Sequence, residues 1–266
     1  MVLRLICCLL LLWCSPLLVA ASCPAPRIDL ISQVRSVYDA DTLTLSDGTR
    51  VRLAGIDAPE LGRDGAADEP FAREGRDRLR QILRHSGQQV HLMLPHVDHA
   101  HPDNRDRYGR LRAQVFLADG RHVQGLLLEE GWVMHVALQA DDPWAACLHQ
   151  AERPALQAGR GIWSLTEYGH GIPAQQIPDS AQGAIRLVGQ IQRIGQSRDA
   201  YWINLEGRVA LQLPRRDWSD AALAALNLRE GQSISARGWL IRTPGGRHQD
   251  ALIRISHPLA LERADF

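Results

Sequence analysis

An Asp-Gly turn between two alternating stretches is the feature that most constrains the fold of this chain. Thr42-Leu43-Thr44-Leu45 and Arg50-Val51-Arg52-Leu53 alternate polar with apolar residues, and Ser46-Asp47-Gly48-Thr49 lies between them. A two-residue period on both sides of Asp-Gly is a strong short-range signal of a β-hairpin. Together with the apolar positions that precede it, the pattern predicts strands across residues 28–53.

The next hundred residues mix helical and strand-like periods. One apolar face over residues 70–83 predicts an amphipathic helix with Asp68 as its N-cap. A strand is expected at 89–94, and a second hairpin at 111–117 turns at Asp119-Gly120 into a strand at 121–123. Helices are expected at 123–130 and 143–158. Pro154 should kink or end the second of these, because proline lacks a backbone donor.

The second half of the chain returns to strands. A stretch rich in Gly, Pro and Gln at 159–178 predicts a linker, which we place at 166–183, before a second domain at 184–262. A helix near 219–226 lies between the third and fourth of five predicted strands, the order of a small OB-type barrel. The five strands are expected at 186–191, 200–205, 209–213, 233–241 and 251–255.

Composition excludes some functions. The chain has 266 residues with 30 basic and 30 acidic side chains, and every basic residue is Arg. A chemistry that needs a Lys nucleophile or Schiff base is therefore excluded. The balanced charge also argues against a polybasic protein that coats nucleic acid by charge alone.

The N-terminus predicts export. One positive charge at Arg4 precedes an apolar run at 5–21 that ends in small residues, which is typical of a signal peptide at 1–22. Pro16 interrupts this run, which is short for a membrane-spanning helix. Cleavage after Ala21 would release a periplasmic or extracellular protein. Alternatively, Ala20-Ala21-Ser22-Cys23 resembles a bacterial lipobox, in which a lipidated Cys23 would tether the protein to the envelope.

Two cysteines remain after the signal, Cys23 and Cys147. Two are too few for a disulfide scaffold. A Cys23–Cys147 bridge is open in an oxidising compartment, but the more ordinary interpretation is a processed Cys23 and a buried thiol at Cys147 on a helix.

Carboxylates and arginines gather where the predicted strands begin and end. Asp41 and Asp57 are hard oxygen donors that hairpin pairing could bring to one divalent ion. Arg52 and Asp57 are five residues apart and would point to opposite faces of a continuous strand, so the strand must break near Gly55. Glu60 follows the break. Phosphodiester hydrolysis requires a metal ion on the phosphate, a base that activates water, and guanidinium groups that stabilise the charge of the transition state.

The cluster His96-Val97-Asp98-His99-Ala100-His101 invites a transition-metal interpretation. Its irregular spacing does not match structural zinc sites, so we interpret it as a solvated loop beside the site.

Five ordered motifs in residues 28–164 resemble the staphylococcal-type thermonuclease family. They are Asp39-Ala40-Asp41-Thr42, Arg52-Leu53-Ala54-Gly55-Ile56-Asp57-Ala58-Pro59-Glu60, Arg107-Tyr108-Gly109-Arg110, Asp119-Gly120 and Gly161-Ile162-Trp163-Ser164. The resemblance implies a first domain at 28–165 that is an OB-type five-stranded barrel with three helices. With the second small OB-like barrel, the fold class is mainly β with helices (α+β).

The same resemblance implies the chemistry. It implies Ca²⁺ held by Asp41, Asp57 and the Ala58 carbonyl, and water activated by Glu60. It implies that Arg52 and Arg110 stabilise the transition state, while Arg107 and Tyr108 contact substrate. The expected reaction is cleavage of DNA and RNA, single-stranded or flexible, to 3′-phosphate products. Because the ligand at this position is the backbone carbonyl and not the side chain, Ala58 can replace the Thr that is commoner in the family.

The chain departs from the family beside the substrate. Where the family's best-known member has two Tyr, residues 134–139 offer no aromatic ring beyond His135. The family's lysines are absent too, and 17 Arg against 20 acidic residues over 24–165 leave a charge of −3. We therefore expect weak, salt-sensitive binding of nucleic acid.

The second domain carries Trp202, Trp218 and Trp239, and its nucleic-acid candidates are Arg215-Arg216 and the Gly-Gly loop at 242–247. The sequence thus predicts an exported, calcium-dependent, sugar-nonspecific endonuclease. The alternative is a noncatalytic envelope scaffold that binds nucleic acid or protein with the same fold. The filled carboxylate and arginine positions disfavour it.

Overall fold

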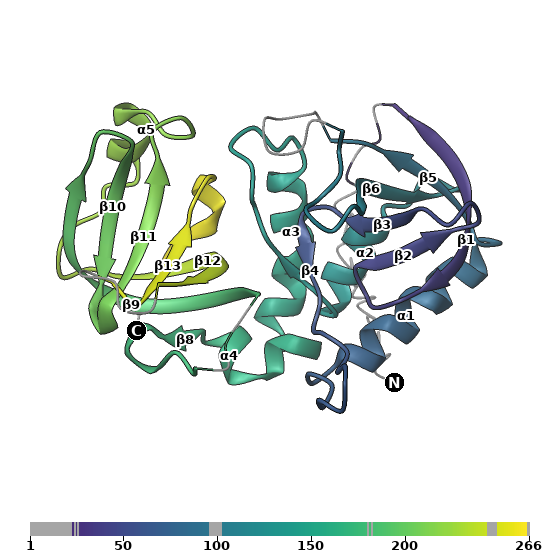
Figure 1. The fold of residues 1–266 in the computed structure, drawn as a ribbon, viewed down its shortest axis with the longest axis horizontal. Coiled ribbons are helices and arrows are strands. Elements are labelled where there is room, and N and C mark those ends of the chain that lie inside the picture. Colours follow the sequence, from purple (N-terminus) through teal and green to yellow (C-terminus); the bar gives the residue numbers. More distant parts are fainter. Residues whose placement is uncertain are drawn as a thin grey trace, which may run out of the picture.

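The computed structural model describes residues 23, 25, 27–95, 103–179, 181, 183–243 and 249–264. The predicted signal peptide at 1–22, the cluster at 96–101 and most of the loop at 242–247 lie outside these residues. The rest forms two β-barrels side by side, with α3 between them (Figure 1). The barrels and a few helices confirm the predicted α+β class.

Five strands close the first barrel in the order β1-β2-β3-β6-β5. The polar–apolar alternation of these strands puts Leu43, Leu45, Val51 and Leu53 into the core, all with no exposed surface. β3 and β6 run parallel, and the other neighbours are antiparallel. The strands are β1 (Leu30–Val37), β2 (Thr42–Leu45), β3 (Arg50–Leu53), β5 (Gln89–Met93) and β6 (Leu111–Leu117).

Helices cover one side of this barrel, and a short antiparallel pair of strands lies at its edge (Figure 1). The helices are α1 (Ala72–His85), α2 (Val123–Glu130), α3 (Ala145–Gln157) and η1 (Gly161–Ser164), and the pair is β4 (Ile56–Asp57) with β7 (Met134–His135). In α1 the face of Leu79, Ile82 and Leu83 is buried against the barrel core, as the helical period predicts.

Three local predictions are wrong in whole or in part. The N-cap of α1 is Phe71, in the left-handed conformation, because Asp68 is engaged by the Gly62 N–H and by Arg73. Residues 121–123 form only a single bridge, Phe116 to His122, since α2 begins at Val123. Pro154 does not end α3, which continues to Gln157, because the flanking Ala151 and Ala155 are packed in the interior.

The second barrel closes through a pairing of its first and fourth strands, in the order β9-β10-β11-β13-β12-β9. All five predicted strands form, and the helix between the third and fourth begins at Ser219, whose hydroxyl accepts the Ala222 N–H at 3.1 Å. The elements are β9 (Ala184–Gln196), β10 (Ala200–Leu205), η3 (Glu206–Arg208), β11 (Val209–Pro214), α5 (Asp220–Ala225), β12 (Ser233–Arg242), β13 (Ala251–Arg254), η4 (Pro258–Ala260) and β14 (Leu261–Arg263).

Residues 166–183, the predicted linker, carry short elements: α4 (Thr166–Gly169), β8 (Ile172–Pro173) and η2 (Ala174–Gln176). β8 adds to the second sheet in parallel with β9. The domain boundaries at 28–165 and 184–262 stay predictions.

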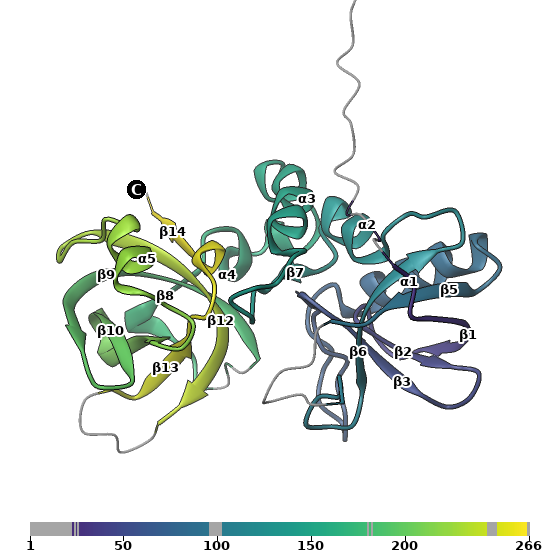
Figure 2. The ribbon, with the colours of Figure 1, turned by 90° about the horizontal axis from the view of Figure 1, so that it is seen from above.

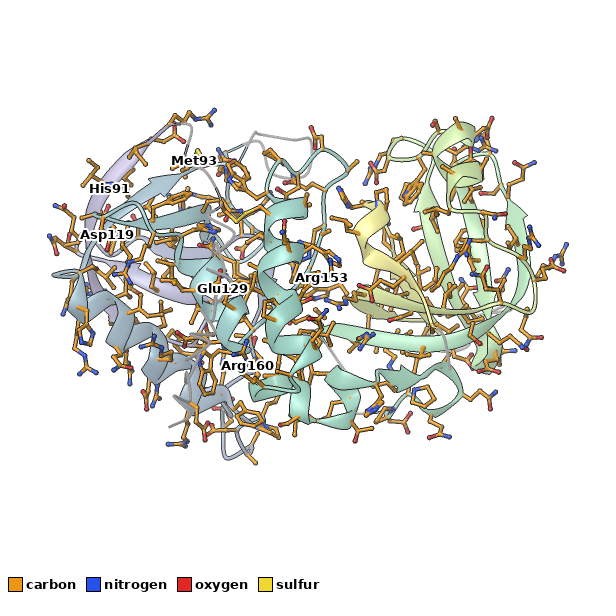
Figure 3. The ribbon with its side chains drawn as sticks, turned by 180° about the vertical axis from the view of Figure 1, so that it is seen from behind. His91, Met93, Asp119, Glu129, Arg153 and Arg160 are labelled. Carbon is orange, nitrogen blue, oxygen red and sulfur yellow. A yellow bond between two sulfur atoms is a disulfide. The ribbon has the colours of Figure 1, made fainter. Side chains whose placement is uncertain are left out.

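A buried ion pair joins the two halves. Glu152 of α3 and Arg237 of β12 are 1% and 3% exposed as side chains, and a guanidinium nitrogen of Arg237 contacts the Glu152 carboxylate. The other Glu152 oxygen accepts the His135 N–H at 2.7 Å, which ties this pair to β7. Seen from above and from behind, α3 lies between the barrels, with Arg153 on its flank toward the second one (Figures 2 and 3).

A disulfide links Cys23 to Cys147 of α3, with 5.6 Å between the Cα atoms and 124 residues between them in sequence. The expectation of a free, buried Cys147 thiol is therefore wrong. The alternative of a lipidated Cys23 stays a prediction, and a sulfur in a disulfide could not at the same time carry a thioether. None of the helices in the described part of the chain has the length and apolar character to span a membrane.

His122 makes stability depend on pH. Its ring lies 4.7 Å from that of Phe116 in the core, Nε2 donates to Gln114 Oε1 at 2.9 Å, and burial lowers its pKa to about 3. Below the ordinary histidine pKa of 6.5, the unfolded chain binds a proton at this ring but the folded chain does not. The free energy of unfolding therefore decreases as the pH is lowered. We expect a loss of up to about 1.4 kcal/mol per pH unit from this ring.

Urea unfolding between pH 7 and 5 tests this, with His122→Gln as the comparison, because a neutral amide has no such proton to gain. The variant should show a shallower pH dependence than the wild type. Parallel curves would exclude the assigned cause.

Candidate active site

The turn from β1 to β2 holds two buried aspartates. Asp39 and Asp41 are both 3% exposed. Asp39 Oδ1 accepts the Asp41 N–H at 3.0 Å, and Asp41 in turn accepts the Thr42 hydroxyl at 2.9 Å and the Ala58 N–H at 2.9 Å. These bonds fix the direction of the Asp41 carboxylate.

The predicted strand break brings Arg52 back toward Asp57. β3 ends at Leu53, Gly55 adopts a positive φ of 81°, and β4 places Asp57 beside the outer face of β3. The Arg52 guanidinium then joins both metal-ligand candidates: one nitrogen forms an ion pair with Asp41, and Nη2 donates to Asp57 Oδ1 at 2.5 Å. Two carboxylates that are 16 residues apart in sequence therefore face the same guanidinium group.

The pKa of Asp57 is strongly perturbed. Burial raises its pKa to about 6; the Arg52 charge works against this shift, and the Glu60 charge adds to it. The backbone at the start of β9 adjoins the same carboxylate, and the Ala184 N–H acts to lower its pKa. A ligand candidate of the first barrel thus lies against the second.

Glu60 stands at the open side of the site. Its side chain is exposed, and its backbone is fixed by Glu69, whose Oε2 accepts the Glu60 N–H at 2.8 Å and whose N–H donates to the Glu60 carbonyl at 2.9 Å. Partial burial and the Asp39 charge raise the pKa of Glu60, while Arg52 and Arg63 oppose the shift. A carboxylate with these neighbours suits a general base.

Arg110 lies at the end of the loop that leads into β6, directly before Leu111. Its Nε donates to Asp106 Oδ2 at 2.6 Å and its Nη1 to the Thr42 hydroxyl at 3.2 Å. Burial alone would raise the pKa of Asp106, but the bonds from Arg110 leave it below the ordinary value. Asp106 therefore stays ionised and orients the guanidinium.

Tyr108 and Arg107 form the rim. Tyr108 is 63% exposed, and the guanidinium groups of Arg107 and Arg110 lie 5.0 and 5.3 Å from its ring centroid. By contrast, His135 is 2% exposed beneath the surface. Its ring cannot replace the missing tyrosines by stacking on substrate.

The structure brings together Asp41, Arg52, Asp57, Glu60 and Arg110, and it places Arg107 and Tyr108 at the edge. Ala58 contributes its N–H to Asp41; the predicted role of its carbonyl stays a prediction. Sequence reasoning missed Asp106, although its spacing of four residues from Arg110 is a signal for an ion pair. It also missed Ala184, for which no local pattern exists.

The donor set fits a divalent cation that takes oxygen ligands. Burial raises the pKa values of Asp39, Asp57 and Glu60, and a neighbouring carboxylate charge adds to the shift of Asp57 and of Glu60. Within the described ranges, no three His, Cys, Asp or Glu residues form a metal-binding group. Asp41 and Asp57 would therefore share a cation with a backbone carbonyl, water or phosphate oxygens.

A shared oxygen-donor pair, an exposed carboxylate and two oriented guanidinium groups on an OB-type barrel define a class of phosphodiester-cleaving proteins. Comparison with known proteins agrees. Residues 50–165 match the family described as Staphylococcal nuclease homologue. The chain belongs to this family, and the activity that the family supports is that of a nuclease acting on nucleic acid.

Relatives span several kingdoms. An "Uncharacterized endonuclease" of Escherichia coli is 30% identical over 146 residues, which cover 54% of this chain and 83% of the relative. The "Thermonuclease" of Staphylococcus intermedius is 28% identical over 133 residues, 49% of this chain and 74% of the relative. "Ribonuclease TUDOR 2" of Arabidopsis thaliana is 29% identical over 169 residues, 58% of this chain and 16% of the relative.

Proposed function

We propose that this chain is an exported, calcium-dependent endonuclease that hydrolyses DNA and RNA to 3′-phosphate products without regard to the sugar. The observation that carries the proposal is the guanidinium group of Arg52, which forms ion pairs with both Asp41 and Asp57 beside Glu60. Relatives with this domain are named as endonuclease, thermonuclease and ribonuclease. These names support the proposal that both DNA and RNA are substrates.

Each residue has a distinct task. Asp41, Asp57 and the Ala58 carbonyl would hold Ca²⁺, which supplies positive charge beside the phosphoryl oxygens when bound. Glu60 takes the proton from the attacking water. Arg52 and Arg110 donate to the phosphoryl oxygens as negative charge builds up on them, and Asp106 holds Arg110 in the orientation that this requires.

Metal exchange tests the proposal. The purified chain is incubated with single-stranded DNA or RNA in calcium, in magnesium or in a chelator, and the product ends are assayed for 3′-phosphate. We expect turnover with calcium alone, because magnesium demands tighter octahedral geometry and holds its waters. Equal cleavage in the chelator, or 5′-phosphate ends, would exclude this function.

Export rests on the predicted signal peptide and on the disulfide. Disulfides persist in oxidising compartments such as the periplasm or the extracellular space, and the Cys23–Cys147 bond supports such a location. It favours the route in which the signal peptide is cleaved and the protein is released without a lipid. The intact mass of the mature protein distinguishes the two routes.

Tyr108 should matter for substrate affinity. Its exposed ring beside Arg110 is a surface on which an unpaired base can stack, which is worth about 1–3 kcal/mol per base. Tyr108→Ala should therefore raise KM for single-stranded DNA about tenfold, whereas Tyr108→Phe should retain the wild-type KM. Steady-state kinetics checks this, and an equal loss in both variants would assign the effect to the hydroxyl instead.

A further inference from the structure

The outer face of β1, β2 and β3 continues past the catalytic arginine into a second polar row. Thr42 pairs with Arg52 in the first row. In the next row, two residues along the strands, Ser36 pairs with Thr44 and Thr44 with Arg50. Because side chains alternate along a strand, Arg50 and Arg52 share one face, about 7 Å apart along the strand.

This second row lies in a depression of about 360 Å³, which is lined by Ser36, Val37, Tyr38, Thr44, Arg50 and Arg63. The volume is at the lower end of the range for small-molecule sites, about 300–1,000 Å³, and suits one nucleotide-sized group. The lining contains two arginines and no carboxylate. In the described part of the chain, no ion pair involves Arg50 or Arg63, so both guanidinium groups are available to an anion.

An aromatic ring completes the depression. Tyr38 is 37% exposed, and the Arg63 guanidinium lies 5.1 Å from its ring centroid. Tyr38 is joined to the catalytic row, because its N–H donates to the Thr42 carbonyl at 2.9 Å and Asp39 follows it in sequence. Arg63 acts electrostatically on Glu60, so the other wall of the depression also adjoins the active site.

Exposed arginines on a barrel are most often merely solvated. Here three features coincide: a hollow of nucleotide size, an exposed ring beside two arginines that form no ion pair in the described part of the chain, and strand register that continues from Arg52. We propose that the depression is a second nucleotide subsite, which takes the phosphate that adjoins the scissile phosphodiester in a single-stranded nucleic acid and the nucleotide beyond that phosphate. The base of this nucleotide stacks on Tyr38, and Arg50 and Arg63 bind the phosphate.

This proposal rests on the proposed nuclease function and predicts a dependence on substrate length. A dinucleotide with a single phosphodiester cannot fill both the catalytic row and the subsite, whereas a longer oligothymidylate can. Arg50→Ala and Tyr38→Ala should lower the ratio of kcat/KM for the oligothymidylate to kcat/KM for the dinucleotide by at least about tenfold. Tyr38→Phe should restore the ratio, because the phenyl ring still stacks.

Arg35→Ala is the matched control. Arg35 is an exposed arginine of β1, the strand that contributes Ser36 and Val37 to the depression, but it does not line the depression itself, so its loss removes the same charge without touching the subsite. This variant should keep the wild-type ratio. An unchanged ratio in Arg50→Ala, an equal loss on both substrates, or the same loss in Arg35→Ala would overturn the subsite.

A binding assay separates this proposal from the nuclease function. The fluorescence anisotropy of a labelled oligothymidylate is titrated with each full-length protein in a chelator, where no cleavage interferes. Weaker binding by Arg50→Ala and Tyr38→Ala, with Arg35→Ala as wild type, supports the subsite even if no cleavage is ever observed. Equal binding by all four proteins refutes it even if the protein cleaves DNA.

Discussion

Replacing Glu60 with Gln should reduce calcium-dependent cleavage by about 10²- to 10⁴-fold while leaving the fold intact. The amide has nearly the shape of the acid but cannot accept the proton of the attacking water. Because the side chain is exposed and its backbone is held by Glu69, the exchange leaves no unpaired buried group. Single-turnover cleavage of single-stranded DNA at saturating calcium measures the loss.

Two measurements show whether the loss is chemical. Glu74→Gln makes the same charge change at an exposed position of α1 and should cleave like the wild type. Wild-type cleavage should rise with pH as Glu60 loses its proton, at a pKa above the ordinary 4.5 because of burial and the Asp39 charge. Glu60→Gln should lose that rise. Undiminished cleavage by Glu60→Gln would remove Glu60 as the base.

The β framework was predictable from local patterns. Alternation around Asp47-Gly48 predicts β2 and β3 correctly, because an inward residue at every second position is what a barrel wall demands. The break after Leu53 followed from geometry alone, since Arg52 and Asp57 cannot otherwise face the same point. The ordered motifs then identified the family, and the matching relatives confirm it.

What escaped prediction depends on contacts between distant segments. The Phe71 cap and the continuation of α3 through Pro154 are consequences of tertiary packing, which overrides local propensity. β4 and β7 are two residues each and lie almost eighty positions apart in the sequence. Strands this short have no periodic pattern that could be detected. The contact of Ala184 with Asp57 depends on how two barrels pack, for which periodicity carries no signal.

The contact between the two barrels includes a buried charge pair, and breaking this pair from one side should be costly. In Glu152→Ala, the one ion pair left to Arg237 within the described residues is with Glu262, at 3.6 Å and 30% exposed, and the His135 N–H loses its acceptor. We expect the free energy of unfolding to fall by about 3–5 kcal/mol, because a buried guanidinium is left without adequate compensation. Equilibrium urea unfolding, followed by tryptophan fluorescence, gives the value.

Removing both charges at once should be far cheaper, and this difference identifies the cause. Glu152→Leu combined with Arg237→Met replaces the pair with apolar side chains of similar volume, which is often neutral for stability once no ion is left unpaired. The double variant should therefore be more stable than Glu152→Ala despite carrying two substitutions. If the double variant loses as much stability as Glu152→Leu and Arg237→Met lose together when each is made alone, the cost lies in the packing of Arg237 on the Trp163 ring, 5.2 Å away, and not in the unpaired charge.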